Sequence, residues 1–197
     1  RFLGGAGPRA GSVHRNLMRP IYQSLPYMNP ERAFAPFAAV PHSIFLDSAA
    51  RVGARGRYSY IAVDPYAVIT SNGQDNGDPF DGLEQALGTA WLDTDPDLPP
   101  FQGGAVGYLG YELNRHLEHL PEPAITGAEL PELMFGLYDT VLAFDHDTRQ
   151  CWAIATDPPN GPPNIDQRAS AEDRLGALVR RIAACPTLTG VDWSATG

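Results

Sequence analysis

Residues 101–112 read Phe-Gln-Gly-Gly-Ala-Val-Gly-Tyr-Leu-Gly-Tyr-Glu, and the fold can be worked out from this stretch outward. Its glycines, Gly103, Gly104, Gly107 and Gly110, are interspersed with apolar and aromatic residues. A glycine inside a strand packs no side chain and loses the most backbone entropy, so it needs a reason such as close packing or a positive φ. The pattern therefore predicts a tightly packed central strand that turns into a helix.

A phosphate-binding loop is the alternative interpretation of these glycines. The stretch contains no G-x-x-x-x-G-K-[S/T], and the series Gly104-x-x-Gly107-x-x-Gly110 lacks the G-x-G opening of the dinucleotide fingerprint. All 14 basic residues of the chain are arginines, so neither a P-loop lysine nor a Schiff-base lysine can come from it. Nucleotide binding is therefore disfavoured.

The composition is that of an acidic chain with enough apolar residues for a sizeable core. Its 197 residues are 43% hydrophobic, which suits one large domain. The net charge of −9 argues against nucleic acid and anionic membrane partners, because both attract a basic face. No apolar run approaches the ~18 residues needed to span a bilayer. Cys151 and Cys185 form no C-x-x-C pair, so we expect reduced thiols and a cytoplasmic protein.

The beginning of the chain predicts a loose tail. Residues 1–12 are rich in glycine and slightly basic, and they lack the apolar segment of a signal peptide. We expect tail and lead-in over residues 1–28. The folded domain then starts at Asn29-Pro30, where Asn can cap a helix and Pro fits its first turn.

The rest of the chain predicts short strands with occasional helices. The helix expected after Asp78 carries Leu83, Leu87 and Trp91 on one apolar face. Because the strands and helices do not alternate regularly, we expect an α+β fold of mostly antiparallel sheets packed face to face, with a few flanking helices. Strands are expected at 43–47, 57–63, 66–70, 133–145 and 150–156, and further helices at 113–120 and 166–184.

Few residues suggest catalysis. His116 and His119 could form a metal pair on one helix, but no third or fourth ligand is spaced to join them, so a solvated helix face is favoured. His146 falls in an expected hairpin turn, where we expect it to be exposed. Ser48 and Ser59 lack the G-x-S-x-G context of a hydrolase nucleophile.

One constellation could bind a small polar ligand. Ser48 ends one expected strand, and Arg57 and Tyr58 begin the next across a loop of small residues. A hydroxyl, a guanidinium and an aromatic ring together suit the amine, carboxylate and side chain of an amino acid. In the alternative, Ser48 caps a turn and Arg57 makes a surface ion pair. The residues alone favour this alternative.

Three segments in the same order resemble the N-terminal region of chorismate-using enzymes. They are Phe-Leu-Asp-Ser-Ala at 45–49, Gly-Arg-Tyr-Ser-Tyr-Ile-Ala-Val-Asp-Pro at 56–65 and Pro-Phe-Gln-Gly-Gly-Ala-Val-Gly-Tyr-Leu-Gly-Tyr-Glu-Leu at 100–113. The family comprises anthranilate synthase component I and aminodeoxychorismate synthase component I, and the resemblance covers about residues 35–195. Leu-Asp-Ser-Ala and Phe-Gln-Gly-Gly look more like the aminodeoxychorismate branch.

The resemblance implies a division of labour between two parts of a longer enzyme. The N-terminal domain would occupy residues 29–190, and residues 191–197 would begin the linker to a C-terminal chorismate-binding domain. That second domain carries the active site and the Mg²⁺-binding glutamates in the family, so no catalytic residue, metal or cofactor is expected here. The family also implies a glutamine amidotransferase subunit, component II, as the partner that supplies ammonia for p-aminobenzoate and folate synthesis.

The resemblance also strengthens the amino-acid interpretation. Relatives bind tryptophan in this domain, either as a feedback inhibitor or as a tightly held structural ligand. Asp47 stands where relatives often have Glu or His, which bears on specificity. The matching positions here are Leu46, Ser48, Arg55, Gly56, Arg57 and Tyr58.

Overall fold

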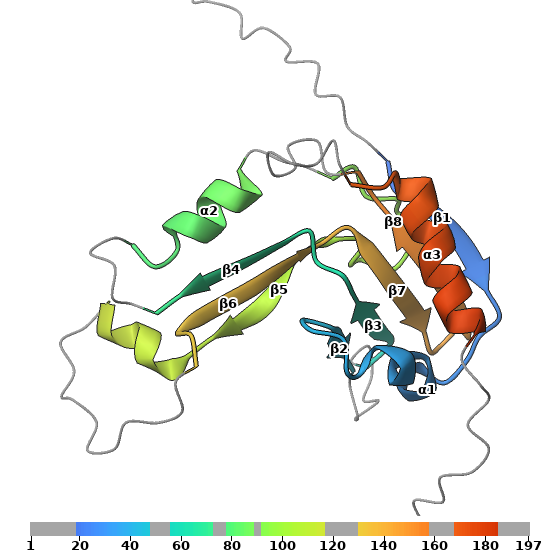
Figure 1. Ribbon diagram of the computed structural model, residues 1–197. Coiled ribbons are helices and arrows are strands. Elements are labelled where there is room, and N and C mark those ends of the chain that lie inside the picture. Colours follow the sequence, from blue (N-terminus) through green and yellow to red (C-terminus); the bar gives the residue numbers. More distant parts are fainter. Residues whose placement is uncertain are drawn as a thin grey trace, which may run out of the picture.

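The computed structural model describes residues 19–47, 56–72, 78–88, 92–116, 130–157 and 168–184. Within them the chain forms two antiparallel β-sheets and a few helices, so the expected α+β class is confirmed (Figure 1). No helix in these ranges is long and apolar enough to cross a membrane.

The larger sheet has five strands, with β7 at its centre. β7 pairs with β8 on one side and with β3 on the other, and β1 and β2 form the two edges. The strands, in sheet order, are β1 (Ile21–Leu25), β8 (Gln150–Ala155), β7 (Thr140–Asp145), β3 (Tyr58–Ala62) and β2 (Ile44–Leu46).

The smaller sheet has three strands and diverges from the first one (Figure 1). β3 leads into β4, and β6 leads into β7, so the two sheets share a corner. Tyr138 and Val141 at this corner pack with Val106 of the smaller sheet. Its strands, in order, are β4 (Ala67–Ser71), β6 (Leu133–Tyr138) and β5 (Gly104–Leu109).

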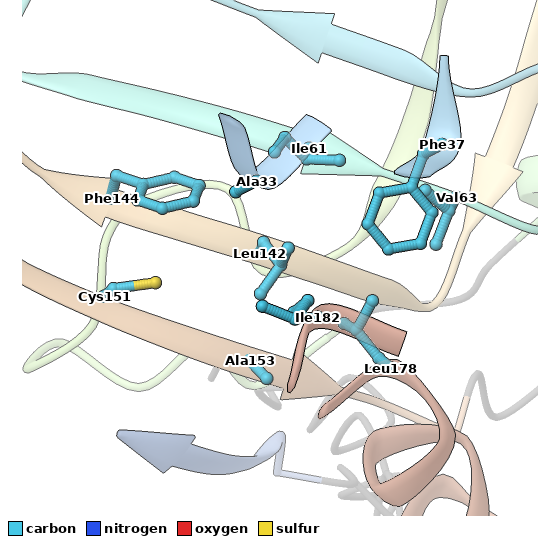
Figure 2. Close-up of a cluster of buried hydrophobic side chains, with 10 residues drawn as sticks. All are labelled: Ala33, Phe37, Ile61, Val63, Leu142, Phe144, Cys151, Ala153, Leu178 and Ile182. Carbon is cyan, nitrogen blue, oxygen red and sulfur yellow. The ribbon is translucent and has the colours of Figure 1, made fainter. Parts of the chain in front are cut away.

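The main core lies between one face of the five-stranded sheet and three helical segments (Figure 2). These segments are α1 (Pro30–Phe34), the 3-10 turn η1 (Ala35–Phe37) and α3 (Ala171–Ala183). The cluster of Figure 2 consists of Ala33, Phe37, Ile61, Val63, Leu142, Phe144, Cys151, Ala153, Leu178 and Ile182. On the opposite face, Leu98 covers Ala143, Trp152 and Ile154, so the inner strands β7 and β8 are buried on both sides.

The sequence predicted the bounds of most strands and helices close to those in the structure. The four shorter predicted strands agree with the structure to within one residue at each end. Asn29 caps α1 as expected, because its side chain accepts a hydrogen bond from the Arg32 amide at 3.1 Å. α3 begins later than expected, after the Ser170 side chain caps it.

The predicted strand over 133–145 is wrong, because Asp139 divides it into β6 and β7 in different sheets. The Asp139 carbonyl accepts from the Thr156 amide at 2.9 Å, and its carboxylate binds Arg168. Those polar groups are thus satisfied outside a regular ladder, which allows the chain to change sheets there.

The prediction that the glycine-rich strand is central is also wrong. β5 is an edge strand, because β6 lies between it and β4. The two physical reasons predicted for glycine in this strand, close packing and a positive φ, are nevertheless both found. A Cβ on Gly107 would lie 2.6 Å from the Cα of Phe135 on β6, and Gly104 has a φ of +126°. The expected helix over 113–120 is a 3-10 helix, η2 (Tyr111–His116), and residues 117–120 lie outside the described ranges.

Two further expectations need correction. β1 forms inside the segment that we expected to be a loose lead-in, because it pairs with β8 along its whole length. α2 (Asp81–Leu87) starts three residues after Asp78, whose side chain instead holds the Phe80 amide at 2.9 Å. No residue of α2 is fully buried, so its apolar face contributes less to the core than the sequence suggests.

Candidate functional site

The ends of β2, β3 and β7 meet at one end of the five-stranded sheet. Antiparallel pairing places Leu46 opposite Tyr60 and Tyr58 opposite Asp145. The end of β2, the beginning of β3 and the end of β7 are therefore neighbours, as the amino-acid interpretation requires.

Arg57 is the charged residue at this end of the sheet. Its Nε and Nη2 donate to Oδ2 of Asp145 at 3.1 and 2.7 Å, and its Nε lies 3.8 Å from Oδ2 of Asp147. The hydrogen bonding of the Arg57 guanidinium to the Asp145 carboxylate is the main reason why the pKa of Arg57 is raised. The Arg57 side chain remains 41% exposed, so part of its five-donor guanidinium still faces outward.

Asp145 is buried and belongs both to this ion pair and to the β7–β8 turn. Its Oδ1 accepts from the amides of Asp147 and Thr148 at 2.9 and 3.2 Å. Burial raises the pKa of Asp145, but the hydrogen bonds from Arg57 and from the turn outweigh it, so the pKa is lowered. The carboxylate therefore stays ionised and fixes both the guanidinium and the turn.

A second polar group lies on the helix-covered face of the same strand ends. Ser59 Oγ donates to Oδ1 of Asp47 at 2.5 Å and lies 2.6 Å from Nε2 of His146. His146 Nδ1 lies 2.8 Å from the hydroxyl of Tyr27. The expectation that His146 is exposed is wrong: it is buried because its ring packs edge-on against Tyr27 and contacts Ser59.

The opposite face of these strand ends is aromatic. The guanidinium of Arg57 lies 4.8 Å from the ring centroid of Tyr58, and the rings of Tyr58 and Tyr60 are 6.2 Å apart. Leu46 pairs with Tyr60, so its exposed side chain lies on the same face. An exposed guanidinium beside aromatic and apolar side chains can bind a carboxylate that carries an apolar group. The buried serine has no access to a substrate, so the arrangement suits binding and not nucleophilic catalysis.

The structure brings together only part of the predicted set. Arg57 and Tyr58 are in contact, and Leu46 lies on the neighbouring strand. Gly56 has the positive φ of +75° that allows the chain to turn into β3. Ser48 and Arg55 lie outside the described residues, and their roles stay predictions.

Sequence reasoning missed Tyr27, Ser59, Asp145 and His146. The available signal was the two-residue period of a strand, which places Ser59 on the face opposite to Tyr58 and Tyr60. Which residues meet it there depends on strand register, and one sequence does not reveal that register. The side chains of His116 and His119, the candidate metal pair, lie outside the described part of the chain. Among the described residues, no three histidine, cysteine or acidic side chains are grouped closely enough to hold a metal.

A second charged cluster lies at the other end of β7. Arg168 binds buried Asp139 through two hydrogen bonds of 2.8 and 2.9 Å, and Arg174 lies 3.5 Å away from it. Arg181 pairs with Asp64 beside a cavity of about 80 Å³. Each of these arginines has an acidic partner, so the cluster is a structural clamp between α3 and the sheet corner.

A family model described as "chorismate binding enzyme" matches residues 42–184, and the chain belongs to this family. Its relatives include aminodeoxychorismate synthase component 1 of Klebsiella aerogenes, which is 32% identical over 73% of this chain and 35% of its own length. Anthranilate synthase component 1 of Streptomyces coelicolor is 34% identical over 83% of this chain and 31% of its own.

The solved structure of anthranilate synthase component I from Streptococcus pneumoniae is also similar. It has a TM-score of 0.49 at 22% identity, over 77% of this chain and 34% of that one. This chain thus spans about a third of the length of the curated relatives that it matches.

Proposed function

We propose that this chain is the N-terminal part of aminodeoxychorismate synthase component I. The parent enzyme would convert chorismate and ammonia to 4-amino-4-deoxychorismate, on the route to p-aminobenzoate and folate. Family membership supports chorismate as the substrate. The Leu-Asp-Ser-Ala and Phe-Gln-Gly-Gly segments support this branch over anthranilate synthase, whose members are among the relatives at comparable identity.

In this proposal the domain that begins with β1 and extends to residue 190 has a structural and amino-acid-binding role, and residues 191–197 lead to a chorismate-binding catalytic domain. The short span of the chain relative to its relatives supports this division. So does an exposed apolar surface beside β5, where Tyr111 is 85% exposed and Leu109 and Leu130 are also exposed. Mg²⁺ would bind in the catalytic domain, and a glutamine amidotransferase subunit would supply the ammonia. The relatives are named component 1 of their synthases, which supports such a second subunit.

The observation that carries the binding role is the half-exposed Arg57, fixed by Asp145 next to Tyr58 and Leu46. Such a site suits the carboxylate and ring of tryptophan. Ser48 and Arg55 would add polar contacts, and Gly56 would leave room for the ligand.

Product analysis tests the enzymatic proposal. The full-length gene product, incubated with chorismate, ammonium and Mg²⁺, should form 4-amino-4-deoxychorismate. Anthranilate as the product would assign the chain to the other branch instead. The 197-residue chain alone should leave chorismate unchanged, and turnover by this chain would contradict the proposed division between domains.

A second candidate is a free-standing amino-acid-binding module. It is favoured by the fact that Leu46, Arg57, Tyr58 and Asp145 all belong to this one chain. Calorimetry with millimolar L-tryptophan separates the candidates. Saturable binding by the 197-residue chain favours the module, whereas a pocket completed by another domain predicts weak or undetectable binding to this chain and clear binding to the full-length gene product.

A further inference from the structure

The polar network behind the proposed amino-acid site runs through four side chains in series. It connects the hydroxyl of Tyr27 to His146 at 2.8 Å, His146 to Ser59 at 2.6 Å, and Ser59 to Asp47 at 2.5 Å. These residues come from the segment before α1, the β7–β8 turn, β3 and the end of β2. The network therefore ties together four segments that are distant in sequence.

The donors and acceptors of the four side chains determine the direction of each hydrogen bond in the network. A carboxylate only accepts, so the single Ser59 proton is donated to Asp47. The remaining contact of Ser59 then requires that Nε2 of His146 carries a proton and donates to Oγ. In the neutral ring, Nδ1 accepts from the Tyr27 hydroxyl. Every group in the series is thus satisfied in a single arrangement, which favours one geometry for the strand ends.

The same network holds the backbone of the binding residues. The backbone amide of His146 donates to the carbonyl of Arg57 at 2.9 Å, and its side chain contacts Ser59, two residues further along. Tyr58 lies between these two anchors. Because successive strand residues face opposite sides, Tyr58 presents its ring to the face opposite to Ser59.

We propose that Ser59, His146 and Tyr27 are positioning residues, which hold the ends of β2 and β3 in place for an aromatic amino acid bound on the opposite face. This inference rests on the proposed function, because it concerns the same site. The network touches the strands from the helix-covered side, so its members act through Asp47, Arg57 and Tyr58 and not by contact with the ligand.

Affinity for L-tryptophan is measured by calorimetry in the full-length gene product. Ser59→Ala should weaken binding about tenfold, because it removes both the hydrogen bond to the Asp47 carboxylate and the Oγ that Nε2 of His146 contacts. His146→Leu should act similarly. His146→Gln should restore most of the affinity, because its amide N–H can donate to Ser59. Tyr27→Phe, at the far end of the network, should weaken binding only about twofold to threefold.

Thr140→Val is the matched control. Thr140 is a buried hydroxyl at the other end of β7 that bonds Asp139. Its loss should lower the melting temperature to an extent comparable to Ser59→Ala and leave tryptophan affinity unchanged. Amide exchange adds a ligand-free measurement: Ser59→Ala should accelerate exchange at Tyr58 more than at Val141, whereas uniform loosening of the sheet would affect both.

The outcomes separate the inference from the proposal on which it rests. If the unaltered gene product binds tryptophan and Ser59→Ala and His146→Leu bind it equally well, the positioning role is overturned and the amino-acid site stands. Failure of His146→Gln to recover affinity also counts against positioning. If the unaltered protein shows no saturable binding, the amino-acid site itself is overturned, and this inference falls with it.

Discussion

The two sheets differ in how much of their surface the chain covers. Every residue of β7 and all but the first of β8 are buried, because helices pack on one face of the five-stranded sheet and the 92–103 segment on the other. The three-stranded sheet has one inner strand, β6, which is mostly buried, while the last three residues of β5 are exposed and residues of β4 alternate between half-buried and exposed. The edge strands β1 and β2 of the larger sheet are partly exposed too. The strands of both sheets pair antiparallel in continuous register, so regular pairing alone does not bury a strand.

This difference in burial suggests different roles for the two sheets. The five-stranded sheet provides most of the stability, and the three-stranded sheet has an exposed edge that a partner could contact. The five-stranded sheet contains the main core and the polar network, and at its strand ends the Asp145 carboxylate binds the guanidinium of Arg57. The three-stranded sheet leaves Tyr108 and Leu109 exposed near the edge of β5. If the five-stranded sheet holds the core, substitutions in it and at the shared corner should lower the free energy of unfolding far more than equivalent substitutions in the three-stranded sheet.

The largest effect is expected at Asp139, at the corner between the sheets. Asp139→Ala should lower the free energy of unfolding by about 3–5 kcal/mol, because it leaves Arg168 and Arg174 without their shared carboxylate. Urea denaturation measures the change. Asp93→Ala, which removes the exposed pair with Arg19, is the control and should have little effect. Equal losses of unfolding free energy for Asp139→Ala and Asp93→Ala would show that the ion pairs of Asp139 do not stabilise the corner.

A matched pair of leucines tests the comparison directly. Leu142→Ala in β7 should cost about 2–5 kcal/mol, since Leu142 is fully buried in the main core. Leu109→Ala in β5 should change the free energy of unfolding by less than about 0.5 kcal/mol, because half of its side chain is already exposed. Similar losses at both positions would contradict the assignment of the core to one sheet.

Gly107 in the three-stranded sheet is an exception to the expectation that substitutions in this sheet cost little stability. Gly107→Val should destabilise by about 1–3 kcal/mol or more despite its exposed surroundings, because its side chain would press on the β6 backbone at Phe135. Gly176→Ala in α3 is the control of opposite sign. Among the described residues, the new methyl group would meet only the far end of the flexible Arg180 side chain, so stability should rise by about 0.4–1 kcal/mol. An unchanged melting temperature for Gly107→Val would show that β5 and β6 can separate.

Alkaline stability gives the most gradual effect, because it develops over several pH units. Burial raises the pKa of Cys151 from 9.0 to about 12 and that of Tyr138 from 10.0 to about 12. Between pH 9 and 12 the unfolded chain loses these protons while the folded chain keeps them, so stability should fall as pH rises. The slope is at most about 1.4 kcal/mol per pH unit for each group.

Urea denaturation from pH 8 to pH 11 measures this slope. Cys151→Ala should remove the part of the decline that begins near pH 9, and Tyr138→Phe the part that begins near pH 10. Both variants are compared with the unaltered chain at pH 7, where neither group titrates. A slope that neither substitution changes would mean that other groups, such as Tyr60 and Tyr66, whose pKa values burial also raises, control the alkaline limit.

The sequence by itself determined the class of fold, the bounds of four strands and the cap of α1. These features depend on local chemistry: β-branched and aromatic runs, turn residues, and the side chain of Asn29 reaching an amide three residues away. The motifs at 45–49, 56–65 and 100–113 also pointed to the family, because an ordered set of short segments is specific without any knowledge of the fold.

Only the tertiary structure decided which residues meet. Arg57 and Asp145 are 88 residues apart, and Tyr27 and His146 are 119 apart, so no local pattern couples them. The same holds for the division of 133–145 at Asp139, the edge position of β5 and the burial of His146. Each of these depends on strand order and register, which are set by the burial of the whole sheet between its helices and the facing segment, and neighbours in sequence carry little information about that packing.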